Sequence, residues 1–93
     1  MRTIKFRGEL VESGEYVYGY FWVDRDGKKR IANSTSPNHE VEKVAQLVGY
    51  DRNGHEVYEG DRIRHPHGTI GYEADMRHIY SVKHEELVEN EGL

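Results

Sequence analysis

The sequence contains no cysteine, which excludes a disulfide framework, a thiolate zinc site and a cysteine nucleophile. It also lacks any run of about 18 apolar residues, the length that a membrane-spanning helix requires. The N-terminal stretch MRTIKFRGEL has basic side chains but no apolar segment of a secretory signal. These absences predict a cytoplasmic chain that does not enter a membrane.

The composition favours short strands and tight turns, because 10 of the 93 residues are glycine and 7 are tyrosine. A chain of this length predicts one small domain, which we place at residues 1–84, followed by an acidic tail at 85–93. Residues 1–46 carry 8 Lys or Arg and 7 Asp or Glu, a net charge of +1. Residues 47–93 carry 5 and 10, a net charge of −5. This asymmetry argues against a protein that coats nucleic acid over its whole surface and leaves a local basic face open.

Alternating and aromatic-rich segments predict most of the strands. Residues 3–7 (TIKFR) alternate apolar and polar side chains, as a half-buried strand does. Residues 16–24 (YVYGYFWVD) are apolar on both faces, which predicts a central strand that is packed on two sides or lines a curved sheet. Gly19 predicts a bulge or sharp bend within it. Asp26-Gly27 predicts a hairpin turn to a return strand at 28–32, and residues 33–38 predict a loop.

Residues 39–48 (HEVEKVAQLV) have the only helical spacing, with apolar side chains at 41, 44, 45 and 48. They predict one short helix. Further strands are expected at 56–58, 61–65, 69–72 and 77–83, with a frayed tail after residue 83. The whole pattern predicts a mainly β fold, α+β at most: a small, SH3-like, strongly bent β-barrel with one short helix.

The stretch DRNGHEVYEGD, residues 51–61, raises the question of a functional carboxylate cluster. An EF-hand loop beginning at Asp51 would need glycine at its sixth position, which is Glu56, so the calcium site fails. A pair of catalytic carboxylates would need a cleft that the sequence does not indicate. Asn53-Gly54 instead predicts a type I′ turn, and the residues Glu59-Gly60-Asp61 predict a second turn.

Three blocks of the sequence resemble the YopX family of phage and prophage proteins. They are IKFRG at 4–8, VYGY at 17–20 and QLVGYDRNGHEVYEGDRIR at 46–64. The matching positions are Tyr18, Gly19, Gln46, Gly49, Asp51, Asn53, Gly54, Tyr58, Glu59, Gly60 and Asp61. Family members usually continue with a longer C-terminal β segment, similar to an SH3-like barrel. The family has no assigned molecular activity and no agreed catalytic residues, so the resemblance implies a phage-derived accessory protein in a bacterial cell.

Two binding hypotheses follow from the residues. The first is a module that binds a protein partner or itself, because aromatic side chains are enriched at interfaces. In this hypothesis Phe21 and Val23 belong to the core, whereas Tyr20 and Trp22 lie at the surface.

The second hypothesis is nucleic-acid binding, because residues 60–71 (GDRIRHPHGTIG) loosely resemble KOW-type segments of SH3-like barrels. The candidate contacts are Lys28, Lys29, Arg30, Arg62 and Arg64, with a further basic run at Arg2, Lys5 and Arg7.

A third hypothesis is a metal protein or an enzyme. His65-Pro-His67 places two imidazoles on one side of an extended chain, and His78 would have to supply a third ligand. The sequence contains no G-x-S-x-G, P-loop, G-x-G-x-x-G or H-E-x-x-H motif. We therefore predict no catalysis, no bound metal and no cofactor.

Overall fold

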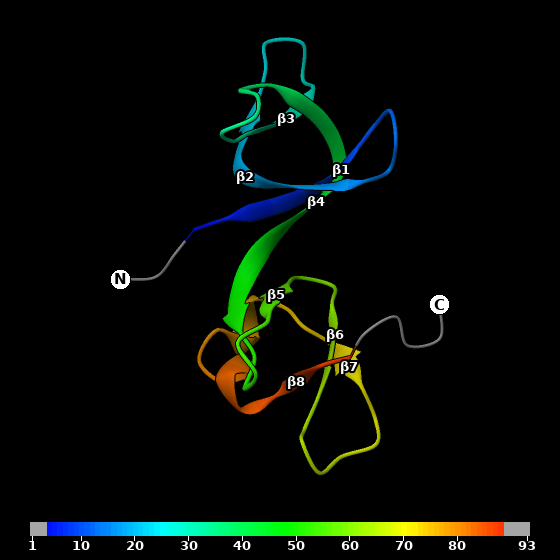
Figure 1. The fold of residues 1–93 in the computed structure, drawn as a ribbon, viewed down its shortest axis with the longest axis vertical. Coiled ribbons are helices and arrows are strands. Elements are labelled where there is room, and N and C mark those ends of the chain that lie inside the picture. Colours follow the sequence, from blue (N-terminus) through cyan, green and yellow to red (C-terminus); the bar gives the residue numbers. More distant parts are fainter. Residues whose placement is uncertain (1–3, 89–93) are drawn as a thin grey trace. The chain divides into compact units, whose positions relative to one another are not determined.

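The computed structural model describes residues 4–88 and is mainly β, as the sequence predicted, with a bent sheet that is not closed (Figure 1). The chain divides into two compact units, Met1–Gln46 and Leu47–Leu93. None of the helical segments between residues 4 and 88 has the length and hydrophobicity that crossing a bilayer requires.

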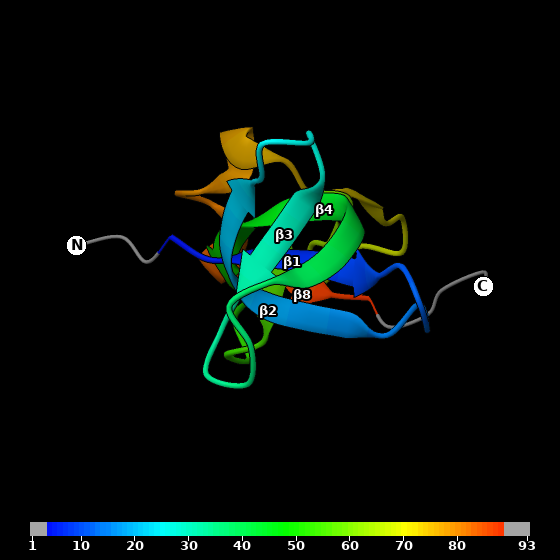
Figure 2. The same cartoon turned by 90° about the horizontal axis from the view of Figure 1, so that it is seen from above.

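Unit 1 is built from three strands and the first part of a fourth: β1 (Phe6–Leu10), β2 (Tyr16–Val23), β3 (Lys29–Ala32) and β4 (His39–Tyr50). All pairings are antiparallel. β2 pairs with β1 through residues 16–19 and with β3 through residues 20–23. β4 pairs with β3 at its start and with β1 further along, so the strands curve around a shared interior (Figure 2).

The interior of unit 1 is small and tightly packed. Ile31 and Val41 are buried there, and the rings of Phe6 and Phe21 lie 5.5 Å apart. Gly8 faces the same interior, where a Cβ would meet Val41 Cβ at 2.8 Å. The sequence therefore has glycine at a position of β1 where the Val41 side chain of β4 leaves no room for a Cβ.

The helix predicted at residues 39–48 is wrong, because these residues belong to β4. The register of β1 against β4 shifts between Arg7 and Glu9, so β4 carries an extra residue. Lys43 lies in this bulge with φ of 52°. The extra residue separates inward-facing Val41 from Val44 by three positions instead of two, which imitates helical spacing in the sequence.

Unit 2 contains the end of β4, which pairs with β5 (Glu56–Tyr58), and a separate three-stranded sheet. In that sheet β6 (Arg62–Arg64) lies between β7 (Tyr72–Glu73) and β8 (Glu86–Leu87). The buried core consists of Val48, Val57, Ile63, Ala74 and Val82. Each β6 neighbour pairs through only two positions, so this core stabilises unit 2 more than its ladders do.

The sequence mispredicted the C-terminal part of unit 2. Residues 77–83 are not a strand, because the chain forms two 3-10 turns, η1 (Met76–His78) and η2 (Val82–His84). The Asp75 side chain caps η1 by accepting a hydrogen bond from Arg77 N–H at 2.8 Å. The predicted tail is wrong for residues 85–88, because Glu85 is buried and β8 follows it; residues 89–93 lie outside the described part.

Candidate binding surface on the outer face of β2

The outer face of β2 carries a row of exposed aromatic side chains at every second residue. Tyr16, Tyr18, Tyr20 and Trp22 are 52%, 39%, 73% and 41% exposed. Of the two arrangements predicted for β2, packing on both sides is wrong and lining a curved sheet is the one observed. The core assignment of Val23 is also wrong, because Val23 is more than half exposed. The surface positions predicted for Tyr20 and Trp22 are confirmed, and Phe21 packs inward against Phe6.

Two cations from the N-terminal segment lie against this row. Arg7 is the cross-strand partner of Tyr18, and its guanidinium lies 4.6 Å from the centre of the Tyr16 ring. The Lys5 ammonium lies 5.6 Å from the centre of the Tyr18 ring. Such cation–π contacts stabilise an exposed surface by about 0.5–1 kcal/mol each. They also hold positive charge beside the aromatic faces, where an incoming ligand would meet both.

Trp22 is held in a fixed orientation although its ring is exposed. Its Nε1 donates a hydrogen bond to the carbonyl oxygen of Pro37 at 3.0 Å. Its cross-strand partner Arg30 is anchored in turn, with Nε donating to Asp24 Oδ2 at 3.1 Å. The hydrogen bond from the Lys28 backbone N–H has the largest effect on the pKa of Asp24 and, together with the bonds from Arg30 and the Asp26 N–H, holds that pKa below its ordinary value although burial acts to raise it. The row is thus preorganised at one end, which lowers the entropy cost of binding.

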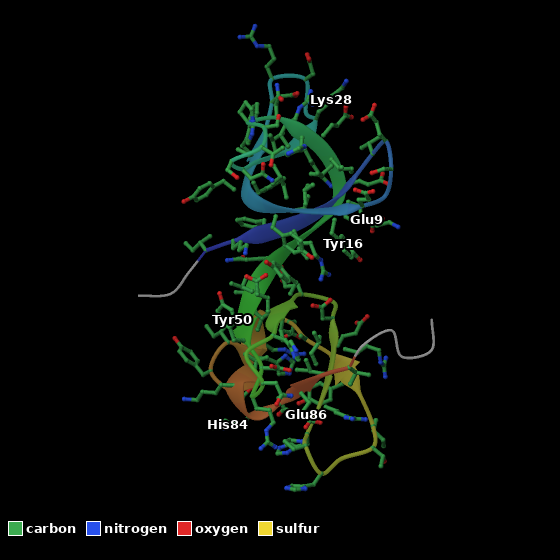
Figure 3. All side chains as sticks on the ribbon, in the orientation of Figure 1. Glu9, Tyr16, Lys28, Tyr50, His84 and Glu86 are labelled. Atoms are coloured by element: carbon green, nitrogen blue, oxygen red, sulfur yellow. The ribbon has the colours of Figure 1, made fainter. Side chains whose placement is uncertain are left out.

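The basic residues predicted to contact nucleic acid are divided between unit 1 and unit 2. Lys28 and Lys29 are exposed at the β2–β3 hairpin of unit 1, where Figure 3 shows Lys28 near the tip. Arg30 already forms an ion pair with Asp24.

Arg62 and Arg64 belong to unit 2 and flank buried Ile63, so they do share a face of β6. Arg62 donates to the Gly71 carbonyl oxygen at 2.9 Å, and Arg64 pairs with Glu86 at 3.4 Å. Both arginines therefore already serve the fold of unit 2.

The first turn of the 51–61 stretch is organised by a buried aspartate. Asp51 Oδ1 accepts hydrogen bonds from the backbone N–H groups of Asn53 and His55 at 2.8 and 2.9 Å. Burial raises the pKa of Asp51, but the hydrogen bonds from Leu87, His55 and Asn53 outweigh it and hold the pKa below its ordinary value. The turn is confirmed, but type I′ is wrong, because Gly54 has positive φ and Asn53 does not.

In the second turn, an aspartate side chain again accepts a hydrogen bond from a backbone N–H. Asp61 Oδ2 accepts from the Tyr58 N–H at 2.9 Å, and Gly60 has φ of 89°. The Tyr58 ring is buried, and its hydroxyl donates to Glu56 Oε1 at 3.1 Å. Two upstream motif residues also have packing roles: Gln46 pairs with Phe6, and Gly49 has Val82 against it. The residues that resemble a family motif therefore build turns and strand contacts.

The metal hypothesis finds no support in the described part of the chain. Among residues 4–88, no group of three or more His, Cys, Asp or Glu side chains is arranged to hold an ion. His78, the suggested third ligand, accepts a hydrogen bond from the Asp75 N–H through Nδ1 at 3.0 Å. Its ring also lies against Tyr72. His78 thus takes part in the cap of η1.

The sequence indicated Lys5 and Arg7 only as part of a basic run and Tyr18 only as a motif residue, without placing them together. The signal was available in the alternation of YVYGYFWV, where Val17, Gly19 and Phe21 share one face and the larger polar aromatics share the other. Comparison with known proteins adds no assignment: no family model, curated protein or solved structure matches the chain. The resemblance to the YopX family therefore stays a prediction.

Proposed function

We propose that this protein is a non-catalytic interaction module that associates with a second copy of itself through the outer face of β2. The observation that carries the proposal is the row of four exposed aromatic side chains on alternate residues of one strand. Tyrosine, tryptophan and arginine are the residues that contribute most to protein interfaces. A row at this spacing presents its rings about 7 Å apart on a regular scaffold.

Charged side chains of both signs lie beside the aromatic row of β2. They favour a second copy of the chain as the partner over a protein whose surface is entirely acidic or entirely basic. Lys5 and Arg7 stand on the same face as Glu9, which is the cross-strand partner of Tyr16. Figure 3 shows Glu9 and Tyr16 on the same part of unit 1. A two-fold axis near Arg7 would bring Lys5 of one copy opposite Glu9 of the other, where Lys43 of that copy already lies 3.7 Å from the carboxylate. Such a self-complementary patch is what a symmetric dimer requires.

Concentration-dependent mass tests the proposal. Size-exclusion chromatography with light scattering should give the wild-type protein a mass above the monomer's 10.9 kDa as its concentration rises. Tyr20→Glu places a charge in the centre of the row and should keep the protein monomeric. Tyr80→Glu is the matched control, because Tyr80 is even more exposed, at 83%, but lies in unit 2. A monomer at every concentration, or equal loss in both variants, contradicts the proposal.

Binding of single-stranded nucleic acid is a second candidate, favoured by the cations that lie over the Tyr16 and Tyr18 rings. Bases stack on aromatic rings while Lys and Arg contact phosphates. Fluorescence anisotropy with labelled single-stranded and double-stranded probes should then show binding to single strands that weakens steeply with salt. Arg7→Gln should weaken it, whereas Arg62→Gln should leave it unchanged. Flat traces on every probe exclude this candidate.

The resemblance to the YopX family also supports a proposal about the protein's origin and cellular location. We propose that the protein is a phage- or prophage-derived accessory protein that acts in the cytoplasm of a bacterial host. Its partner in that setting is protein, in the first place a second copy of this chain.

A further inference from the structure

A cavity of about 360 Å³ opens on unit 1, where the end of β1, β3 and the start of β4 all contribute side chains to its wall. Its volume lies at the lower end of the range for small-molecule binding sites. The apolar part of the wall is formed by Leu10 and Val11, and the charged or titratable part by Glu12, Arg30, His39 and Glu40. None of the four aromatic residues of the β2 row lines the cavity, so it is a different site from the proposed interface.

The guanidinium group in the wall is already neutralised. Arg30 Nε and Nη2 each lie 3.1 Å from Asp24 Oδ2, and Nη1 donates to the Asn38 carbonyl oxygen at 3.3 Å. Asp24 is not part of the wall, so its carboxylate balances the guanidinium from outside the cavity. An anionic ligand would therefore have to compete with Asp24 for Arg30.

Two carboxylates in the wall remain available to a ligand. Glu12 is exposed, and within residues 4–88 no hydrogen bond or ion pair engages its carboxylate. Glu40 lies 3.9 Å from Arg30 Nη1, beyond hydrogen-bond distance, and its side chain is 40% exposed. The backbone holds these two residues near each other, because the Val11 N–H donates to the Glu40 carbonyl oxygen at 3.1 Å.

His39 adds a third hydrogen-bond acceptor. Its Nε2 lies 3.2 Å from Asn33 Oδ1, which also accepts from the Thr35 and Ser36 N–H groups at 2.9 and 3.2 Å. The Asn33 amide is oriented from its other side, where Nδ2 donates to the Tyr18 carbonyl oxygen at 3.1 Å. Because an amide oxygen only accepts, this network assigns the proton of the neutral imidazole to Nε2 and leaves Nδ1 as an acceptor.

We propose that this cavity binds a primary alkylammonium group, whether on a free amine or on a lysine side chain of another molecule. Such a group carries three N–H donors and no acceptor, which matches the acceptors of Glu12, His39 and Glu40. Its alkyl chain packs against Leu10 and Val11, as the carbon stem of a lysine does on apolar surface. Like-charge repulsion from the two carboxylates opposes a carboxylate or phosphate ligand.

Trp22 can report binding although it does not line the cavity. Its Nε1 donates to the carbonyl oxygen of Pro37, between Ser36 and Asn38, and both of these neighbours belong to the wall. A ligand in the cavity should therefore shift the NMR signal of the Trp22 indole N–H together with the backbone amide signals of Asn38 and His39.

Titration with n-butylammonium chloride at about pH 7.5, where primary alkylamines are charged, tests the proposal. The shifts should saturate with a dissociation constant on the order of 1 mM. Sodium butyrate and n-butanol offer a similar apolar chain without an ammonium group and should give no saturable shift. Tetramethylammonium has the charge but no N–H donor and should bind at least about fivefold more weakly.

Nα-acetyl-lysine amide distinguishes the two sources of the ligand. Binding as tight as that of butylammonium means that the cavity accepts a lysine side chain, and binding of butylammonium alone restricts the site to free amines. Either result supports the proposal, because the ammonium group is recognised in both.

Glu12→Gln and Glu40→Gln should each weaken butylammonium binding at least about fivefold, because each removes one negative charge from the wall. Glu42→Gln is the matched control: Glu42 is an exposed carboxylate on the same strand as Glu40 and does not line the cavity. It should bind like the wild-type protein. The proposal is overturned by the absence of a saturable shift with butylammonium, by equal binding of butyrate, or by a loss that Glu42→Gln reproduces.

Discussion

The carboxylate of Asp51 accepts a hydrogen bond from the backbone N–H of Leu87 at 2.8 Å, and so joins the β4–β5 turn to β8 across 36 residues of sequence. The same carboxylate organises its own turn through Asn53 and His55. One buried side chain thus connects the local hairpin to the C-terminal strand. The stability of unit 2 should depend on it.

Asp51→Asn should lower the free energy of unfolding by about 2 kcal/mol, because an amide NH2 cannot accept the bonds that one carboxylate oxygen receives. Urea unfolding measures this change. Asp24→Asn is the comparison: Asp24 Oδ1 accepts the same turn bonds, from Asp26 and Lys28, while its Oδ2 pairs with Arg30 on the adjacent strand instead of with a strand distant in sequence. It should cost less. Equal losses in the two variants would show that the Leu87 bond contributes no more than the Arg30 ion pair does.

Acid should unfold the protein partly through Asp51. Its pKa is lowered in the folded state from an ordinary value of 3.8, so its contribution is present above that value and is lost as pH falls below it. The stability of the wild-type protein should therefore fall more steeply than that of Asp51→Asn as the pH is lowered below about 4. Parallel acid titrations of the two proteins, followed by circular dichroism, would contradict this assignment.

Gly19→Ala should destabilise the protein by about 3 kcal/mol, because an added Cβ would lie 2.2 Å from the Ala32 carbonyl oxygen. Neither β2 pairing shows a register shift at Gly19, so the close approach to β3 explains this glycine better than a bulge does. Gly27→Ala is the control, because nothing lies within 4 Å of its Cβ position and only its φ of 82° is strained. It should cost about 1 kcal/mol in the same urea titration.

Lys43→Gly should be more stable than Lys43→Ala by about 1 kcal/mol, because both lose the ion pair with Glu9 and only glycine relieves the φ of 52°. Chemical unfolding of the two variants measures the difference directly. If alanine is equally stable, the bulge in β4 does not constrain this residue.

The strands that sequence predicted well are those in which local chemistry and packing agree. The Asp26-Gly27 hairpin is such a case, with Gly27 at positive φ and β2 and β3 on either side. The motif D-R-[DN]-G occurs at residues 24–27 and 51–54, and each aspartate accepts the same two backbone bonds. The same local sequence therefore forms the same turn at both places in the chain.

The failures have a common cause in contacts between distant residues. The β4 bulge arises from pairing with β1. It gives residues 39–48 an apolar spacing like that of a helix, and this is why a helix was predicted there. β8 forms because Leu87 donates a hydrogen bond to Asp51 and pairs with Ile63 of β6. Both partners are distant in sequence, so the local residue pattern does not predict this strand. The exposure of the β2 face likewise depends on which neighbours cover it. The aromatic alternation was visible in the sequence, but the position of Arg7 against Tyr16 was not.

Trp22 offers the most direct test of the central claim, because it is the only tryptophan and lies on the proposed interface. Its emission and its quenching by acrylamide can be followed as protein concentration rises, alongside the mass from light scattering. Self-association through β2 predicts emission at shorter wavelength and weaker quenching in parallel with the increase in mass, with both changes absent in Tyr20→Glu. A rise in mass without a change at Trp22, or no rise at all, would contradict the account.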